Sequence, residues 1–436
     1  MLKETFLQHF AGISDKRQEG KIAHPLMSVF FIAVASYVAF CDEWELTIEW
    51  AKKNIDWLRQ FVDLPFGIPS KSTFYRLFRL VNPKEFERRF IGWTKQLASW
   101  HGSRTVSIDG KTLCGAKEGP GDKSPFHIVS AWASDNNLTL GFLRTDVKSN
   151  EITAIPELLK LLSVEGDVIT IDAMGTQTEI AKQIVEGNKA DYVLSLKRNQ
   201  PSMFYDTALF FTGVDLKNTD AISNTANDTG EDHTISILND DMKAAAERIY
   251  NYFASEKTRT SISGKNQLPV FAEYDYQFLK TKDLGHGRIE YRLYFLVNDV
   301  SWLSRDNEWV GLKSVGMVIS YTLIKKTGAK SIDCRFYITS VDNVNRFAES
   351  VRNHWGCEST HYVLDVTFFE DKSRTRKENG ALNDAVFRRI ALNLLKVERE
   401  QFLRDNPKKK ISYKVLRFKA GLDISFLEKI MISNLK

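Results

Sequence analysis

The stretch RTVSIDGKT, residues 104–112, decides the fold prediction, because there the sequence changes from helical periodicity to strand-like texture. Downstream of it, strand-like and helix-like segments alternate. In chain order they are strands at 104–112, 126–134 and 138–147, a helix at 152–162, a strand at 166–174, a helix at 178–188 and a strand at 191–197. This order combines a three-stranded antiparallel meander with βαβ crossovers, so it predicts an α/β core whose sheet is covered on both faces.

The remaining sequence is predicted to surround this core. Residues 1–100 read as a helical domain, 101–200 as the first part of the core, and 201–340 as an inserted β-rich subdomain. The strand-like runs of the insertion are FAEYDYQFL, RIEYRLYFLV, SVGMVISYTLIK and CRFYITS. Residues 341–436 are predicted to return to helices, which complete the core and end in a basic tail.

The N-terminal region contains a loose resemblance to a helix-turn-helix. Apolar periodicity at 44–61 is followed by the loop LPFGIP and a helix in SKSTFYRLFRLV. In such a motif Lys71, Arg76 and Arg79 would face DNA phosphates. The loop is longer than the usual three or four residues, so ordinary helix packing is an equal alternative.

Composition and charge narrow the class of protein. The chain has 436 residues, four cysteines and a net charge of +5. The cysteines form no CxxC and no zinc-type spacing with histidine, which predicts reduced thiols in a cytoplasmic protein and no zinc site. Residues 25–41 are almost entirely apolar, but their length favours a buried core helix over a membrane span. Residues 371–436 hold 17 basic and 8 acidic residues, as expected either for a polyanion partner or for a solvated basic face.

Two aspartates follow apolar strand candidates. Asp109 ends SID before a turn expected at Gly110, and Asp172 ends TID. Ligand sites gather at strand ends in open α/β sheets, and Mg²⁺ prefers carboxylate oxygens and water. The pair therefore predicts a metal site, with the alternative that each aspartate only caps the turn that follows it.

A third carboxylate is offered by the helix predicted at 341–362. Phe347, Val351, His354 and Glu358 are spaced 4, 3 and 4 residues apart, so they share one helical face. Alternatively, this apolar stripe simply emerges into solvent, with His354 as a packing residue. Three carboxylates suit two metal ions that activate a nucleophile and stabilise the leaving oxygen in phosphoryl transfer. The sequence lacks a GxxxxGK[ST] loop, so no nucleotide cofactor is expected.

The chain resembles the H-repeat-associated, DDE-type transposases of bacterial insertion sequences over nearly its full length. The segments that carry the resemblance are KIAHPL, GIPSKSTFYRLF, SIDGKTL, DVKSNEITAIPELL, TIDAMGTQ, YVLSLKRNQ, HGRIEYR, VRNHWGCESTHYVLDVTFFEDKSRTR and ALNLL.

This resemblance implies a ribonuclease-H-like core, whose element order is the one predicted above, and a catalytic triad that also binds metal. The triad falls on Asp109, Asp172 and Glu358, with Mg²⁺ as the expected cofactor and Mn²⁺ as its substitute. Related families also place a Tyr, an Arg and a Lys at fixed offsets from the Glu. Here His354 and Asp365 stand at two of these offsets, so that signature is not met.

The implied partner is double-stranded DNA, both the terminal inverted repeats of the element and the target. A homodimer in a synaptic complex is expected, with a cytoplasmic, nucleoid-associated location and no membrane partner. Besides Lys71 and Arg76, the residues expected to contact phosphates near the metals are Lys111, Lys197, Arg352, His354, Arg374 and Arg376. Two other functions stay open: a transposase-derived DNA-binding protein, and a nuclease without strand transfer.

Overall fold

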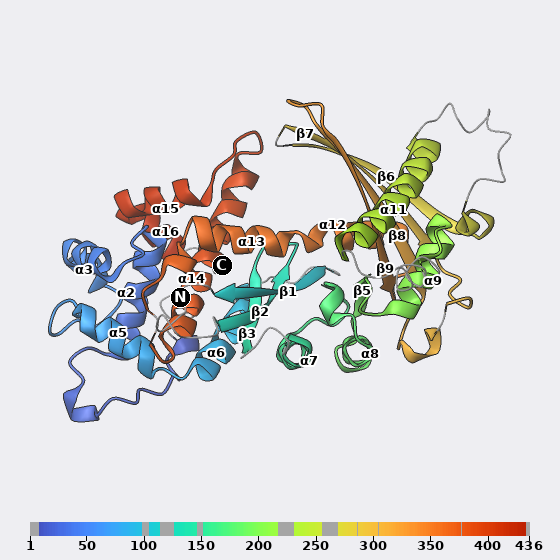
Figure 1. Cartoon of the computed structure of the whole chain (residues 1–436). Helices are drawn as coiled ribbons and strands as arrows, with labels where there is room; N and C mark the ends of the chain where they lie inside the picture. The colour runs from blue at the N-terminus through green and yellow to red at the C-terminus, as the bar shows by residue number, and fades with distance from the viewer. Residues whose placement is uncertain are drawn as a thin grey trace. The chain divides into compact units, whose positions relative to one another are not determined.

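The computed structural model divides the chain into two compact units (Figure 1). Unit 1 is Met1–Val164 together with Trp355–Lys436, and unit 2 is Glu165–His354. The residues that the structure describes are 8–97, 104–113, 126–145, 151–216, 231–254, 269–285, 287–303, 305–375 and 377–432, without the side chains of 231–239.

Unit 1 contains a large helical region built from both ends of the chain. Its helices are α2 (Leu26–Val38), α3 (Trp44–Lys53), α4 (Ile55–Leu58), α5 (Lys71–Leu80), α6 (Pro83–Leu97), α7 (Glu151–Leu161), α13 (Gly356–Val366), α14 (Gly380–Asp405), α15 (Tyr413–Leu422) and α16 (Ile424–Ile432), with short 3₁₀ turns η1 (Glu19–Lys21) and η10 (Glu370–Lys372). Helices α2 and α14 pack against each other at the centre. The Phe387 ring of α14 stacks on Phe78 and meets Phe30 edge-on, at centroid distances of 4.5 and 4.8 Å. The N-terminal helices therefore share one hydrophobic core with the C-terminal ones.

Helix α2 settles the apolar segment at 25–41. It is 13 residues long, and all but one of its residues are buried, including Ser28, Ser36 and Tyr37. The prediction of a buried core helix is confirmed. Among the helices that the structure describes, none is both long and apolar enough to cross a membrane.

The sheet of unit 1 is an antiparallel meander. Its strands are β1 (Thr105–Leu113), β2 (Phe126–Ala133) and β3 (Thr139–Thr145). Helix α13 contacts β1 and β2, whereas α7 contacts β2 and β3. Side chains alternate between the two faces of a strand, so the adjacent residues Asp109 and Gly110 of β1 face different helices. Asp109 faces His361 of α13, and Gly110 faces Glu151 of α7.

The turn expected at Asp109-Gly110 is wrong, because β1 continues through both residues to Leu113. The glycine has a packing reason instead. A Cβ at Gly110 would fall closer to His127 and Glu151 than van der Waals contact allows, and these two buried side chains pair with each other. Glycine here leaves room for a buried pair and does not reverse the chain.

Unit 2 is built on a sheet of six strands in the order β4-β5-β9-β8-β7-β6. Strands β4 (Val168–Ile171) and β5 (Asp191–Leu196) are parallel, and β9 (Lys330–Thr339), β8 (Ser314–Ile324), β7 (Arg288–Val297) and β6 (Tyr276–Gly285) continue antiparallel. The other elements are α8 (Thr178–Lys182), α9 (Pro201–Thr212), α11 (Glu231–Ala254), α12 (Val344–His354), a π-helical turn η5 (Gln183–Gly187), and 3₁₀ turns η4 (Ala173–Gly175), η8 (Val270–Glu273) and η9 (Asp306–Glu308).

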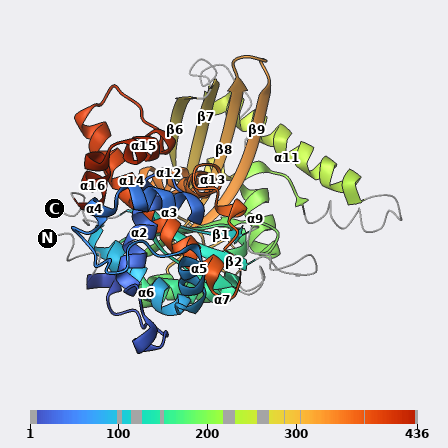
Figure 2. The same ribbon diagram turned by 90° about the vertical axis from the view of Figure 1, so that its left-hand side faces the viewer.

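Helices cover both faces of this sheet. The apolar stripe of α12 packs on one face, where Phe347 meets Tyr294 and Tyr337 edge-on. On the other face Phe253 of α11 packs against Phe295 of β7. Figure 2 shows β6 to β9 side by side with α11 running along them.

The predicted order of three strands, a helix, a strand, a helix and a strand is confirmed, and with it the α/β core and the helical N-terminal region. Two details differ. The segment 201–340 contains the helices α9 and α11 besides its strands. The single helix predicted at 341–362 is interrupted at Trp355, which separates α12 from α13.

Candidate active site

Asp109 lies in the middle of β1 and is partly buried. It stands opposite Ser130 of β2 in the antiparallel register, and its side chain points toward α13. There its Oδ2 lies 3.4 Å from His361 Nδ1. A neutral imidazole can donate to this carboxylate and fix its orientation, and a protonated one forms an ion pair with it.

Glu358 lies in the first turn of α13 and is exposed. Its neighbour Cys357 points inward and is buried. Burial raises the pKa of the Cys357 thiol well above its usual range, and the carboxylates of Asp109 and Glu358 raise it further. A carboxylate oxygen of Asp109 lies within 4.8 Å of the Cys357 sulfur, and Glu358 is the next residue of the chain, so Asp109 lies close to the first turn of α13.

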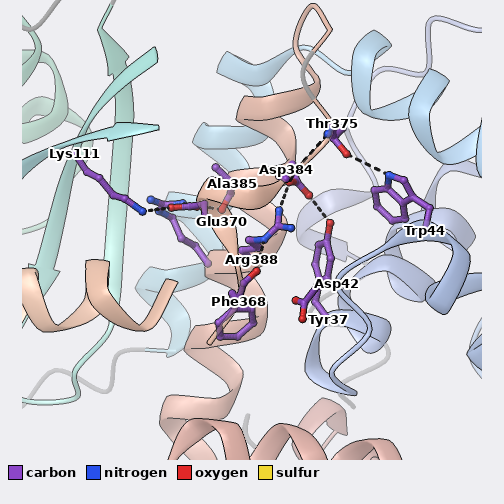
Figure 3. Close-up of polar contacts among 12 residues, drawn as sticks. Tyr37, Asp42, Trp44, Lys111, Phe368, Glu370, Thr375, Asp384, Ala385 and Arg388 are labelled. Carbon is purple, nitrogen blue, oxygen red and sulfur yellow. Dashed lines mark hydrogen bonds and ion pairs between the residues drawn. The ribbon is translucent and has the colours of Figure 1, made fainter. Parts of the chain in front are cut away.

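A buried ion-pair network holds β1 against α13. Lys111 lies two residues after Asp109, on the same face of β1, and pairs with Asp365 of α13 and with Glu370. The Lys111 Nζ to Glu370 Oε2 distance is 2.7 Å, and Arg389 Nη1 of α14 lies 2.5 Å from Glu370 Oε1 (Figure 3). Burial alone would raise the pKa of Glu370, but Arg389 and Lys111 lower it to about 2.

This network changes the role expected for Lys111. The ammonium is buried and occupied by two carboxylates, so Lys111 stabilises the fold of unit 1 and is not available to DNA phosphates. Its two pairs also fix the position of α13 along β1. Asp109 contacts His361. Lys111, two residues later on β1, pairs with Asp365, which lies one helical turn after His361 on α13.

A second buried network fixes the segment that leads from α13 to α14. Asp384 accepts hydrogen bonds from Tyr37 of α2 and from Arg388, and it also accepts one from Ser373 at 2.6 Å (Figure 3). Trp44 donates through Nε1 to Thr375 Oγ1 at 3.2 Å. The segment that carries the exposed Arg374 is thereby tied to the N-terminal helices α2 and α3.

Asp172 belongs to unit 2 and directly follows β4. It is the N-cap of η4, where its Oδ1 accepts from the Met174 backbone N–H at 3.2 Å. The loop after β4 is tied to the end of β5, since Thr176 Oγ1 donates to Ser195 O at 2.6 Å. Lys197 follows β5 and is exposed. Parallel strands end at the same edge, so Asp172 and Lys197 stand at one edge of this sheet.

His354 and Arg352 also lie in unit 2, at the end of α12. His354 Nδ1 is 3.0 Å from Thr170 Oγ1 of β4, and the exposed Arg352 is 3.4 Å from Asp283. His354 ends α12 and Glu358 lies in α13, so the single helix predicted to carry both residues is divided between two helices. A Cβ at Gly356 would overlap the Trp132 ring, which shows how closely the start of α13 lies on β2.

The basic residues of the N-terminal region have exposed positions on α5. Lys71 pairs with Glu45, Arg76 is exposed, and Arg79 pairs with Glu378. A hollow of about 300 Å³ is lined by Lys71 and Arg374 together with Glu45, Tyr75 and Lys372, among others. Arg376 lies outside the described residues.

Comparison with known proteins identifies the family of this chain. Residues 100–394 match the family described as "Transposase DDE domain", and residues 7–94 match the family described as "DDE_Tnp_1-associated". The chain belongs to the DDE transposase family. It is similar to the putative transposase YncI of Escherichia coli O157:H7, with 31% identity over 99% of this chain and 95% of that protein. It is also similar to the H repeat-associated putative transposase YhhI of Escherichia coli strain K12, with 30% identity over 90% of each chain.

One solved structure also matches this chain, at a lower sequence identity than these relatives. It is the piggyBac transposase synaptic complex with hairpin DNA, at 12% identity and a TM-score of 0.39, covering 99% of this chain and 78% of that one. The resemblance to H-repeat-associated transposases, inferred from sequence motifs, is confirmed by the relatives.

Sequence reasoning missed several residues around Asp109 in this family member. His361 and Cys357 were not recognised, although their spacing of four residues places them on one helical face. The buried Lys396 of α14 was also missed. It donates to Thr360 Oγ1 of α13 at 3.0 Å, and burial lowers its pKa to about 7. In the sequence, Lys396 lies in an ordinary amphipathic helix, and nothing there marks it as buried.

Proposed function

We propose that this chain is a DNA transposase that cleaves the ends of its element and joins the freed 3′-OH to target DNA. Two-metal phosphoryl transfer is the proposed chemistry, and Asp109, Asp172 and Glu358 are the proposed catalytic metal ligands. Membership of the DDE transposase family supports the reaction class. The observation that carries the assignment is that a carboxylate oxygen of Asp109 lies within 4.8 Å of Cys357 Sγ, in the residue next to Glu358, although 249 residues separate the two carboxylates in sequence.

The residues fit a hard divalent cation. Asp109 and Glu358 offer carboxylate oxygens, the donors that Mg²⁺ and Mn²⁺ prefer. Both are accessible, since the Asp109 side chain is 24% exposed and Glu358 lies on the surface. Asp172 stands at a strand end, capped by one backbone N–H. When bound, the metal ions supply Lewis-acid stabilisation of the charge on the transferring phosphoryl group.

The protein's own residues orient these carboxylates. His361 holds Asp109 from α13, and the Lys111 pairs hold α13 along β1. The proposed phosphate contacts are the exposed residues Lys197, Arg352 and Arg374, with Lys71 and Arg76 on α5. His354, bonded to Thr170, is proposed to position the end of α12 near the DNA. The proposed partners are double-stranded DNA at the terminal inverted repeats and at the target, and a second copy of this chain for synapsis, with the protein on the bacterial nucleoid.

Glu358→Gln tests the enzymatic proposal, because it removes the charge and keeps the shape. With Mg²⁺ and a labelled terminal-repeat duplex, we expect strand cleavage to fall at least about 100-fold while DNA binding survives. Glu349→Gln, on an exposed position of α12, is the matched control and should cleave normally. Normal cleavage by Glu358→Gln would contradict the triad.

The same assay separates the competing functions. Strand-transfer products joined to the labelled 3′ end indicate a transposase, and cleavage without joining indicates a nuclease. Binding with no cleavage in Mg²⁺ or Mn²⁺ indicates a DNA-binding protein that has lost catalysis.

A further inference from the structure

Three side chains of different chemistry converge beside α13. A carboxylate oxygen of Asp109, the Cys357 sulfur and an imidazole nitrogen of His361 all lie within 4.8 Å of one another. Asp109 comes from β1, and the other two come from one face of α13. All three belong to unit 1.

The three ligand atoms lie somewhat farther apart than the ligands of one tetrahedral metal ion. Cys357 Sγ is 3.9 Å from His361 Nε2, and His361 Nδ1 is 3.4 Å from Asp109 Oδ2. Bonds of about 2.0 to 2.3 Å in a tetrahedron place ligand atoms roughly 3.3 to 3.8 Å apart. Small side-chain rotations, which bring one imidazole nitrogen toward both partners, are enough to reach these separations. Two ligands four residues apart on a helix form a common half of protein zinc sites.

The donor set selects the kind of metal. Thiolate and imidazole ligands suit Zn²⁺, whereas Mg²⁺ takes oxygen ligands and retains water. We propose that Asp109, Cys357 and His361 form a Zn²⁺ site with three protein ligands and an open fourth position. Glu358 follows Cys357 directly and can fill that position, as can water. Binding displaces the thiol proton, which leaves for solvent as the Zn–S bond forms.

The proposed site differs from the expectation that the cysteines take no part in a zinc site. That expectation considered CxxC pairs and local Cys–His spacing, and it overlooked Cys357 and His361. The third ligand, Asp109, lies 248 residues before Cys357, so only the fold brings it to α13.

The binding of Zn²⁺ does not depend on the proposed reaction, but one consequence rests on it. If Asp109 is a catalytic ligand, Zn²⁺ bound here withdraws that carboxylate from Mg²⁺ chemistry. The site would then make strand cleavage sensitive to zinc.

Titration of the full-length reduced chain with Co²⁺, in the absence of DNA, tests the site. A Co²⁺–thiolate bond gives a near-ultraviolet charge-transfer band, and a four-coordinate ion gives intense visible bands. We expect both with one Co²⁺ per chain, and we expect Zn²⁺ to displace them. Cys357→Ser should lose the charge-transfer band, whereas Cys334→Ser, the matched control on β9 in unit 2, should keep it.

Two further variants keep the test decisive if Cys357→Ser folds poorly. His361→Asn and Asp109→Asn should each weaken Co²⁺ binding by at least about tenfold, the loss of roughly 1.4 kcal/mol. Absence of the band in the wild-type chain, its retention in Cys357→Ser, or its loss in Cys334→Ser would overturn the proposal. Strand cleavage is not read in this titration, so the site can fail while the proposed function stands, and the reverse.

Discussion

Asp109 lies within β1 and Asp172 directly follows β4, and different interactions hold the segments around the two residues. Around Asp109, β1 and α13 are joined by buried charges, in which Lys111 and Arg389 share Glu370. Around Asp172, neutral hydrogen bonds hold the loops, such as Thr176 to Ser195 O. Removing one partner of a buried ion pair leaves an uncompensated charge and costs much stability, whereas losing one neutral hydrogen bond costs less. The position of Asp109 should therefore be sensitive to single substitutions and to pH, and that of Asp172 much less so.

Glu370→Gln should produce the largest loss of stability, because it leaves Arg389 buried without its carboxylate and leaves Lys111 with Asp365 alone. Breaking a buried pair of this kind costs about 3 to 5 kcal/mol in the free energy of unfolding. The part due to the carboxylate charge should shrink as the pH falls from the ordinary pKa of 4.5 toward the folded value of about 2, because Glu370 then takes up a proton in the unfolded chain while it stays charged in the folded one. Chemical denaturation at pH 7 and pH 4 measures both effects.

Two control variants complete this comparison. Thr176→Val in unit 2 removes one neutral hydrogen bond and should cost about 1 kcal/mol. Glu308→Gln breaks an exposed pair with Arg305 and should change stability less than Thr176→Val does, because solvent screens the pair. A Glu370→Gln loss no larger than that of Thr176→Val would show that the two surroundings do not differ as described.

Lys396→Met should give a smaller effect that depends on pH. Burial lowers the Lys396 pKa from its ordinary 10.5 to about 7, so between these values the unfolded chain holds a proton that the folded chain lacks. The free energy of unfolding of the wild-type chain should then rise with pH across this window, by up to about 1.4 kcal/mol per pH unit. Lys396→Met should lack this rise. Denaturation between pH 7 and pH 9.5 measures it.

Lys414→Met, at an exposed position of α15, is the matched control for Lys396→Met and should leave the slope unchanged. Equal slopes for the wild-type chain and Lys396→Met would mean that Lys396 does not titrate in this window.

The sequence was informative where local pattern decides the structure. Apolar runs with turn residues between them predicted β1 to β5 in the right order, and Asp172 was correctly placed at a strand end. Asp109 was placed less well, because Gly110 reads locally as a turn residue. Glycine is needed at position 110 because a side chain there would overlap the His127–Glu151 pair, and that pair forms only when α7 packs on the sheet.

Residues that depend on distant partners could not be predicted. Lys111 looked like a surface cation because its partners Asp365 and Glu370 follow 254 and 259 residues later. The break at Trp355 was hidden by continuous helical periodicity on both sides of it. Helix α11 was missed because the four strand-like runs of 201–340 suggested a β-rich subdomain, although the segment AAAERIYNYFA has helical character.

We propose that Asp172 of unit 2 serves the same reaction as Asp109 and Glu358 of unit 1. Asp172→Asn tests it most directly, because asparagine caps a turn about as well as aspartate but is a much weaker metal ligand. The measurement is Mg²⁺-dependent cleavage of a labelled terminal-repeat duplex, with the thermal midpoint recorded on the same sample. We predict an unchanged midpoint, retained DNA binding and a loss of cleavage of at least about 100-fold. Cleavage at the wild-type rate by a folded Asp172→Asn chain would contradict the account.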